Sequence, residues 1–276
     1  MSIEKINQRF QLLNEPVEIL EFLSDQIPDW EIEFHPEHPS TQILAREAFK
    51  NGIDKRTLFF LRKQTAGRGR KTRSWVSSPD GLDLVMTLLI PAKDLPDNPA
   101  MMSLVGGFSV AEALREITSC KFQVKWPNDV FFGNAKVCGI LSELMISGNM
   151  AAVAMGIGIN VNSKPDAFDT TGFLYEIETM SSVYGNKIDL ARLIVEIIEK
   201  VEINFEQLLK DSSQFLQKWN LLGWNVGGKI KFRELGEDWK VGKISGLTPQ
   251  GYLIIMDESG EFVHNLIEGD IVPIYS

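Results

Sequence analysis

The sequence predicts an α+β domain followed by a small all-β module. Apolar residues recur at steps of three and four in residues 99–117 and again in 188–210, which indicates two amphipathic helices. Short apolar runs separated by turn residues fill 122–160 and are typical of strands. After Trp224, glycines punctuate short β-branched runs, a pattern that predicts a small barrel.

These patterns divide the chain into three segments. A chain of 276 residues, 44% hydrophobic and 24% charged, suits one large domain plus a small one. Weak helical patterning interrupted by two prolines predicts that residues 1–34 form a short N-terminal extension. We therefore expect the larger domain at 35–223 and the β-barrel domain at 224–276.

The elements of the larger domain follow in order. Ser40 precedes an apolar helical pattern, so its hydroxyl predicts a helix N-cap. Residues 57–61 form a short apolar run that is typical of a strand, and 82–90 predict a buried strand that Pro91 ends. After the helix at 99–117, further strands are expected at 122–126, at 130–132, at 137–146, and in a run that ends at 156–160.

The charge distribution argues against a general polyanion-binding protein. The net charge is −9, yet residues 62–73 hold six basic and no acidic side chains, which leaves 22 basic against 37 acidic residues elsewhere. An acidic surround would repel a nucleic acid backbone. The local basic cluster therefore favours a small anionic ligand, such as a nucleotide, over a duplex.

Other function classes find little support in the sequence. Cys120 and Cys138 lack metal-ligand spacing, and His35 and His38 come without the carboxylates or cysteines of a metal site, so we expect no protein metal ligands. The N-terminus has no apolar core segment, and no run is long enough to span a membrane. We expect a cytoplasmic protein without membrane contact.

The first motif is the Gly-Arg loop at residues 64–75. Gly67 and Gly69 can adopt positive φ, which would let successive backbone N–H groups point at one anion. Arg68 and Arg70 add planar cationic groups suited to carboxylate or phosphate. An ordinary basic surface loop is the alternative.

The second motif is Lys125-Trp-Pro-Asn-Asp129, followed by Lys136. It predicts a turn that carries an amide and a carboxylate, and a lysine that opens an otherwise apolar strand. The alternative is an Asx-type turn whose lysine reaches water. The Gly-x-Gly-x-Asn pattern at 156–160 is a weaker nucleotide signal, because it lacks a third glycine and opens no visible helix.

Together these segments resemble the catalytic domain of biotin protein ligases, and the resemblance covers residues 35–276. It implies a mixed or antiparallel sheet with flanking helices, like that of class II aminoacyl-tRNA synthetases, and an SH3-like β-barrel at the C-terminus. The matching segments, in the order of the family, are Ser40-Thr41, Gln64–Trp75, Lys125–Asp129, Lys136–Leu141 and Gly156–Asn160.

The resemblance implies a two-step reaction. Biotin and ATP would form biotinyl-AMP and pyrophosphate, and the biotinyl group would then pass to a lysine of a biotin carboxyl carrier domain. Arg70 and Lys136 would neutralise the crowded anions of the first step. Asp129 would position the attacking amine and take its proton in the second, with a purely structural turn cap as the alternative.

Binding roles are implied in the same way. Ser40, Thr41, Gln64 and Arg68 would hold the ureido ring of biotin, and Trp75 would fold over the ligand. Asn128 and Asn160 would lie near the nucleotide, whose phosphates would bring Mg²⁺ without a dedicated protein cage. The resemblance also implies that Gly67, Gly139 and Leu141 are binding residues.

Some features depart from the family pattern. Only 39 residues precede Ser40, too few for a winged helix-turn-helix, so we expect no DNA binding. Residues 161–180 resemble the family loosely, so no adenine contacts are carried over. A homodimer is possible. Two alternatives stay open: a lipoate or octanoate ligase or transferase of the same fold, and a nucleic-acid-binding module that uses residues 62–73.

Overall fold

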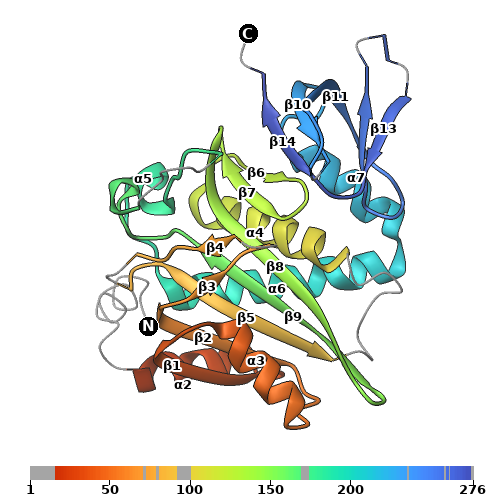
Figure 1. Ribbon diagram of the computed structural model, residues 1–276. Coiled ribbons are helices and arrows are strands. Elements are labelled where there is room, and N and C mark those ends of the chain that lie inside the picture. The colour runs from red at the N-terminus through yellow and green to blue at the C-terminus, as the bar shows by residue number, and fades with distance from the viewer. Residues whose placement is uncertain are drawn as a thin grey trace.

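The predicted α+β architecture is confirmed. The computed structural model describes residues 16–70, 73–78, 81–91, 101–168, 174–234, 236–257, 259–260 and 262–274. Within them the chain forms a seven-stranded sheet with helices on both faces, a five-stranded antiparallel sheet near the C-terminus, and a two-stranded hairpin (Figure 1).

The central sheet is antiparallel except at one edge, where β1 runs parallel to β2. Alternation within each strand sends successive side chains to opposite faces, which suits a sheet covered on both sides. The strand order is β1 (Glu31–His38), β2 (Thr57–Gln64), β5 (Leu84–Pro91), β9 (Met150–Ile159), β8 (Ala135–Ser147), β7 (Asp129–Phe132) and β6 (Phe122–Lys125).

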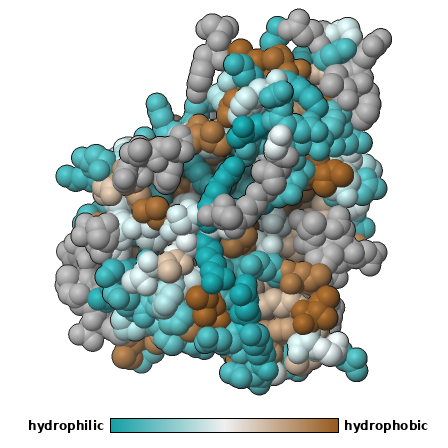
Figure 2. Space-filling model, viewed as in Figure 1, coloured by the Kyte–Doolittle hydropathy of each residue, from teal (hydrophilic) through white to brown (hydrophobic). Residues whose placement is uncertain are grey.

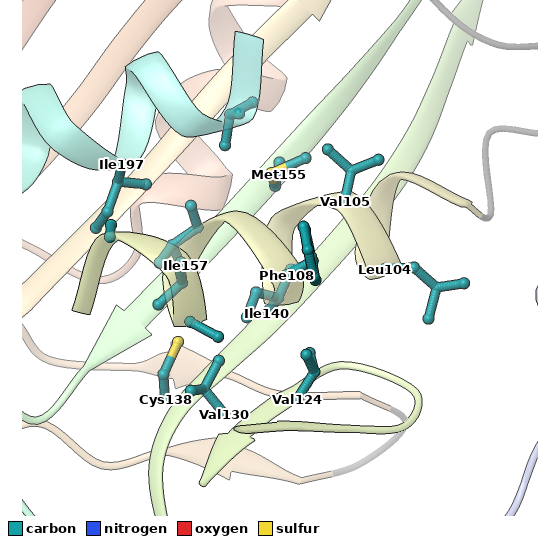
Figure 3. Packing of buried hydrophobic residues seen from close by; sticks show 14 of the residues in the cluster. Leu104, Val105, Phe108, Val124, Val130, Cys138, Ile140, Met155, Ile157 and Ile197 are labelled. Atoms are coloured by element: carbon teal, nitrogen blue, oxygen red, sulfur yellow. The ribbon is translucent and has the colours of Figure 1, made fainter. Parts of the chain in front are cut away.

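Helices bury the two faces of this sheet in separate cores. In β2, Leu58 and Phe60 enter the core under the long helices, whereas Phe59 and Leu61 enter the core under α3. Figure 3 shows the first core, where Phe108 of α4 meets side chains of β6, β7, β8 and β9. The helices are α3 (Thr41–Lys50) on one face, and α4 (Met102–Thr118), α6 (Leu190–Lys210) and α7 (Ser212–Leu222) on the other, with α2 (Pro16–Gln26) and α5 (Met180–Tyr184) at the periphery.

The N-terminal boundary differs from the prediction. Strand β1 begins at Glu31 and ends at His38, so a boundary between residues 34 and 35 falls within a strand. Leu23 of α2 and Trp30 are buried in the core under α4 and α6. The described part of the extension therefore packs as part of the larger domain, because its apolar side chains cover the edge of the sheet.

The C-terminal sheet contacts the larger domain directly. The indole N–H of Trp126 donates to Gly251 O (3.0 Å), the backbone N–H of Trp224 donates to Val124 O (2.7 Å), and the hydroxyl of Tyr175 donates to Ile271 O. The boundary at residue 223 stays a proposal. The strand order is β13 (Phe262–Leu266), β12 (Leu253–Met256), β11 (Lys240–Leu247), β10 (Lys229–Arg233) and β14 (Asp270–Pro273).

The surface is mainly hydrophilic on the face seen in Figure 2, where hydrophobic residues form separate small patches. Most large apolar side chains of the described segments are instead buried between the helices and the sheets. No helix among the described residues is long and apolar enough to cross a membrane.

Candidate active site

A cavity of about 420 Å³ lies against the glycine-bearing segments of β8 and β9, on the face that α3 covers. Its wall also includes the two-stranded hairpin of β3 (Gly67–Arg68) and β4 (Ser74–Trp75), and the turn before β14. The predicted site residues that line it are Ser40, Thr41, Gln64, Arg68, Arg70, Trp75, Asn128, Asp129, Lys136, Gly139, Leu141 and Asn160. Gly67 does not line it.

The start of α3 forms one polar wall of the cavity. Ser40 caps the helix, as predicted, and its hydroxyl accepts a hydrogen bond from Gln42 N (3.3 Å). The backbone N–H of Thr41 donates to Gln64 Oε1 (3.1 Å). Because that carbonyl oxygen is engaged, the amide NH₂ of Gln64 is its available donor toward a ligand.

The glycines of the Gly-Arg loop serve a different purpose from the one predicted. Neither Gly67 nor Gly69 adopts positive φ. A Cβ at Gly67 would lie 2.4 Å from Trp75 O and 2.7 Å from Gln64 Nε2, so glycine permits the close approach of β3 to β4. The expected backbone nest is therefore wrong in its geometry at these two positions. Residues 71 and 72 of this loop lie outside the described residues.

Trp75 lies on a floor made of glycines. A Cβ at Gly158 would lie 2.5 Å from the indole ring, and one at Gly139 would lie 3.2 Å from it. The ammonium of Lys136 stands 5.7 Å from the ring centroid. These two glycines therefore create the flat surface on which a large aromatic group can rest.

A carboxylate and a lysine meet in the wall of the cavity. Asp129 Oδ1 and Lys136 Nζ are 2.7 Å apart, an ion contact rather than a well-aligned hydrogen bond, and the side chains are only 12% and 28% exposed. A bulge in β8 at Val137, opposite Val130 and Phe131 of β7, shifts the register between the two strands. This irregularity, which β-strand patterns do not reveal, brings Lys136 beside the carboxylate.

Arg70 reaches the same region from the hairpin side. Its guanidinium donates to Asn128 Oδ1 (3.5 Å) and pairs with Glu268 (3.1 Å) in the turn between β13 and β14. The side-chain NH₂ of Asn128 donates to Ile140 O (2.6 Å), and that of Asn160 donates to Glu178 O (3.3 Å). Both asparagine side chains are thus held by the backbone, with Arg70 next to one of them.

Several lining residues were not predicted as site residues. Tyr175 and Ile177 come from the region of loose resemblance, Gly269 comes from the turn before β14, and Asp270 is the first residue of β14. Asp270 pairs with Arg73 (2.7 Å) and Arg233 (3.1 Å). Burial raises the pKa of Asp270, but these two arginines outweigh it and hold that pKa below its usual value. Only the tertiary fold brings these residues to the cavity.

Lys125 also lines the cavity although its side chain is almost fully buried. Its ammonium lies over the rings of Tyr175 (4.4 Å), Phe131 (5.4 Å) and Trp224 (5.8 Å). Burial lowers the pKa of Lys125 to about 8, and the neighbouring Asp129 offsets part of that shift.

This buried lysine predicts a pH dependence of stability. Since the pKa is about 8 in the folded chain and near 10.5 when unfolded, the unfolded chain binds more protons between these values, and the free energy of unfolding rises with pH there. The rise is on the order of 3 kcal/mol. Urea unfolding from pH 7 to 10 should show it in the native chain and not in Lys125→Met. Parallel curves for the two proteins would contradict the assignment.

Cysteines and histidines take no part in the cavity. Both cysteines are free thiols, Cys138 being buried and Cys120 half-buried. Among the residues that the structure describes, no three His, Cys, Asp or Glu side chains are grouped to hold a metal ion. His35 pairs with Glu33 on the edge strand β1.

Comparison with known proteins adds independent findings. The model of the biotin/lipoate A/B protein ligase family matches residues 35–160. The bifunctional ligase/repressor BirA of Bacillus spizizenii is 30% identical over 84% of this chain and 70% of its own length. The biotin--[acetyl-CoA-carboxylase] ligase of Mycobacterium tuberculosis is 24% identical over 85% of each chain. The biotin protein ligase of Aquifex aeolicus, solved with biotin and ATP, is 29% identical with a TM-score of 0.72, covering 88% of this chain and 97% of that one.

Proposed function

Because this chain belongs to the family of biotin protein ligases, we propose that it activates biotin with ATP and transfers the biotinyl group to a lysine of a carrier domain. The observation that carries the proposal is that polar and cationic side chains line one cavity. Ser40, Thr41 and Gln64 are the polar groups, and Lys136 and Arg70 are the cations.

The first step joins two anions. The biotin carboxylate attacks the α-phosphate of ATP, the bond to the β-phosphate oxygen breaks, and pyrophosphate leaves. Lys136 and Arg70 would offset the repulsion and stabilise the charge that develops on the phosphate oxygens. The glycine floor and Trp75 would exclude water from the mixed anhydride, which otherwise hydrolyses.

The second step needs a neutral amine. The carrier lysine attacks the acyl carbon, AMP leaves, and the ammonium proton must go to a base. Asp129, a carboxylate that lines the cavity, is the base that we assign to this role. Lys136 keeps that carboxylate in place, so the same ion pair serves both half-reactions.

Two alternatives fit the geometry less well. Lipoate or octanoate would offer no ureido carbonyl to the hydroxyl protons of Ser40 and Thr41 or to the NH₂ of Gln64, which costs binding free energy. A nucleic-acid-binding module would need basic side chains that are free to pair with phosphates, whereas Arg70 and Arg73 are already paired with Glu268 and Asp270. The homologues are biotin ligases.

We propose that Mg²⁺ enters with ATP. The two carboxylates that line the cavity are both ion-paired, Asp129 with Lys136 and Asp270 with Arg73 and Arg233. Mg²⁺ retains several waters and binds readily to substrate phosphates, so the phosphate oxygens of ATP and water would supply its ligands. The ion would neutralise phosphate charge during the first step.

The partner is a biotin carboxyl carrier domain, by analogy with the acetyl-CoA-carboxylase ligases among the relatives. Some relatives are also named repressors, but we propose only ligase activity, because the cavity residues concern ligase chemistry. A homodimer stays a proposal. Strand β8 continues to Ser147, past Gly139, where its pairing with β7 ends, and such a strand edge can pair with another chain.

ATP–pyrophosphate exchange with the purified chain tests the function. Exchange that depends on biotin, and that lipoate and octanoate do not support, is the expected result. Exchange with lipoate or octanoate in place of biotin would transfer the assignment to that acid. Folded protein that shows no exchange with any of the three acids and Mg²⁺ would overturn the proposal.

Arg70→Gly is expected to leave the fold intact and to release the adenylate. Arg70 contributes no core packing, so its loss should change the free energy of unfolding by less than about 1 kcal/mol. Its charge beside Asn128 would no longer hold the adenylate phosphate. Filter binding of radiolabelled biotinyl-AMP measures retention; a variant that retains it as the native chain does would remove Arg70 from this role.

A further inference from the structure

Gln42, the second residue of α3, has a side-chain amide whose NH₂ group is hydrogen-bonded and whose carbonyl oxygen is not. It is 4% exposed and lines the cavity. Its side-chain NH₂ donates to Leu141 O of β8 (2.7 Å) and Ala154 O of β9 (3.3 Å). Because both partners are carbonyl oxygens, the amide can bind only with its nitrogen toward the strands, which fixes the direction of its oxygen.

The carbonyl oxygen of Gln42 has no hydrogen-bond partner among the described residues, and it is buried. A buried acceptor without a partner costs free energy and calls for an explanation. Gly156 supports the arrangement, because a Cβ there would lie 3.0 Å from Gln42 Nε2. The fold therefore makes room for this amide and leaves the oxygen of a cavity-lining residue unsatisfied.

The neighbouring residues Gln64 and Thr41 have the opposite arrangement: their acceptor atoms are already bonded, and their donors are left for a ligand. Gln64 accepts from Thr41 N, so its NH₂ is left to donate. The hydroxyl of Thr87, a fully buried residue of β5, donates to Thr41 Oγ1 (2.8 Å), which leaves the hydroxyl proton of Thr41 for another acceptor. The described wall thus offers donors at Gln64 and Thr41 and an acceptor at Gln42.

A cyclic urea carries the complementary set, one carbonyl oxygen and two N–H groups. We propose that Gln42 Oε1 accepts a hydrogen bond from a ureido N–H of biotin, which makes Gln42 a specificity-determining residue. This inference rests on the proposed function. Lipoate and octanoate carry no N–H at that end, so they would leave the oxygen of Gln42 unpaired.

Gln42→Met, which has nearly the same shape and no acceptor, tests the assignment in the full chain. Equilibrium dialysis measures Kd for biotin and for its two mono-N-methyl ureido analogues. Gln42→Met should weaken biotin binding by roughly 5- to 150-fold. It should weaken binding of one N-methyl analogue by less than about threefold, because that analogue has already lost the bond. Equal losses for all three ligands would indicate a structural role and overturn the proposal, as would unchanged biotin affinity.

Gln42→Glu serves as the second variant if the methionine variant is unstable. A buried, unpaired carboxyl is favoured in its neutral form, whose hydroxyl can donate to Leu141 O while its carbonyl oxygen stays an acceptor. Gln42→Glu should therefore bind biotin more tightly than Gln42→Met; the reverse order would overturn the inference. Gln217→Met, the same change on the exposed face of α7, is the matched control. If the native chain shows no biotin-dependent ATP–pyrophosphate exchange, the proposed function itself is wrong.

Discussion

Lys136→Met is expected to slow biotin-dependent ATP–pyrophosphate exchange by about 10³-fold, which corresponds to roughly 4 kcal/mol of transition-state stabilisation. The ammonium stands beside Asp129 and faces the indole of Trp75, and both side chains of the ion pair are largely buried. A carboxylate and a phosphate meet there during activation, so a fixed positive charge is worth more than it would be in water.

Lys210→Met is the control for this change. Lys210 forms an exposed i,i+4 pair with Glu206 on α6, and such pairs contribute little to stability. Exchange rates measured at saturating biotin and ATP should separate the two variants by about three orders of magnitude. If Lys136→Met stays within tenfold of the native rate, Lys136 does not stabilise the transition state of acid activation.

The parts of this fold that the sequence predicts are those with a local cause. The period of apolar residues in α4 and α6 depends on the helix geometry alone, and the hydroxyl of Ser40 caps the helix that follows it. Ser40 and Lys136 line the cavity, but their expected site roles come from the resemblance to biotin protein ligases and not from a local signal. Strand β1 is harder to predict, because Pro36 argues against a strand and its parallel partner β2 lies after a helix.

The parts that escape prediction have a cause elsewhere in the chain. Position 67 requires glycine because Trp75 approaches it closely, and position 158 requires glycine because the indole of Trp75 lies on it. The predicted positive φ was therefore the wrong explanation for Gly67. The C-terminal sheet brings Asp270 to the cavity across almost 200 residues of chain from its partner Arg73. Gln42 shows its role only when its two carbonyl partners are known.

Asp129→Asn is expected to separate the two half-reactions. Transfer to the carrier should fall by about 10³-fold, because a lysine with a pKa near 10.4 costs about 4 to 5 kcal/mol to deprotonate at pH 7 and an amide cannot accept its proton. Biotin-dependent exchange should fall by no more than about tenfold, since Lys136 keeps its charge beside the phosphate site.

The pH dependence of transfer distinguishes this role from a structural one. Without the base, the rate should follow the neutral fraction of the carrier lysine and rise close to tenfold for each pH unit between 7 and 9, whereas the native chain should rise less steeply. Asp129 lies in the sheet between Lys125 and Gly139, where it could also have a purely structural role. A structural role predicts a different result in these assays. Loss of a structural carboxylate would lower stability and reduce both half-reactions together, with no steepening of the pH profile. Single-turnover transfer from preformed biotinyl-AMP, measured beside exchange on the same preparation, decides between the two.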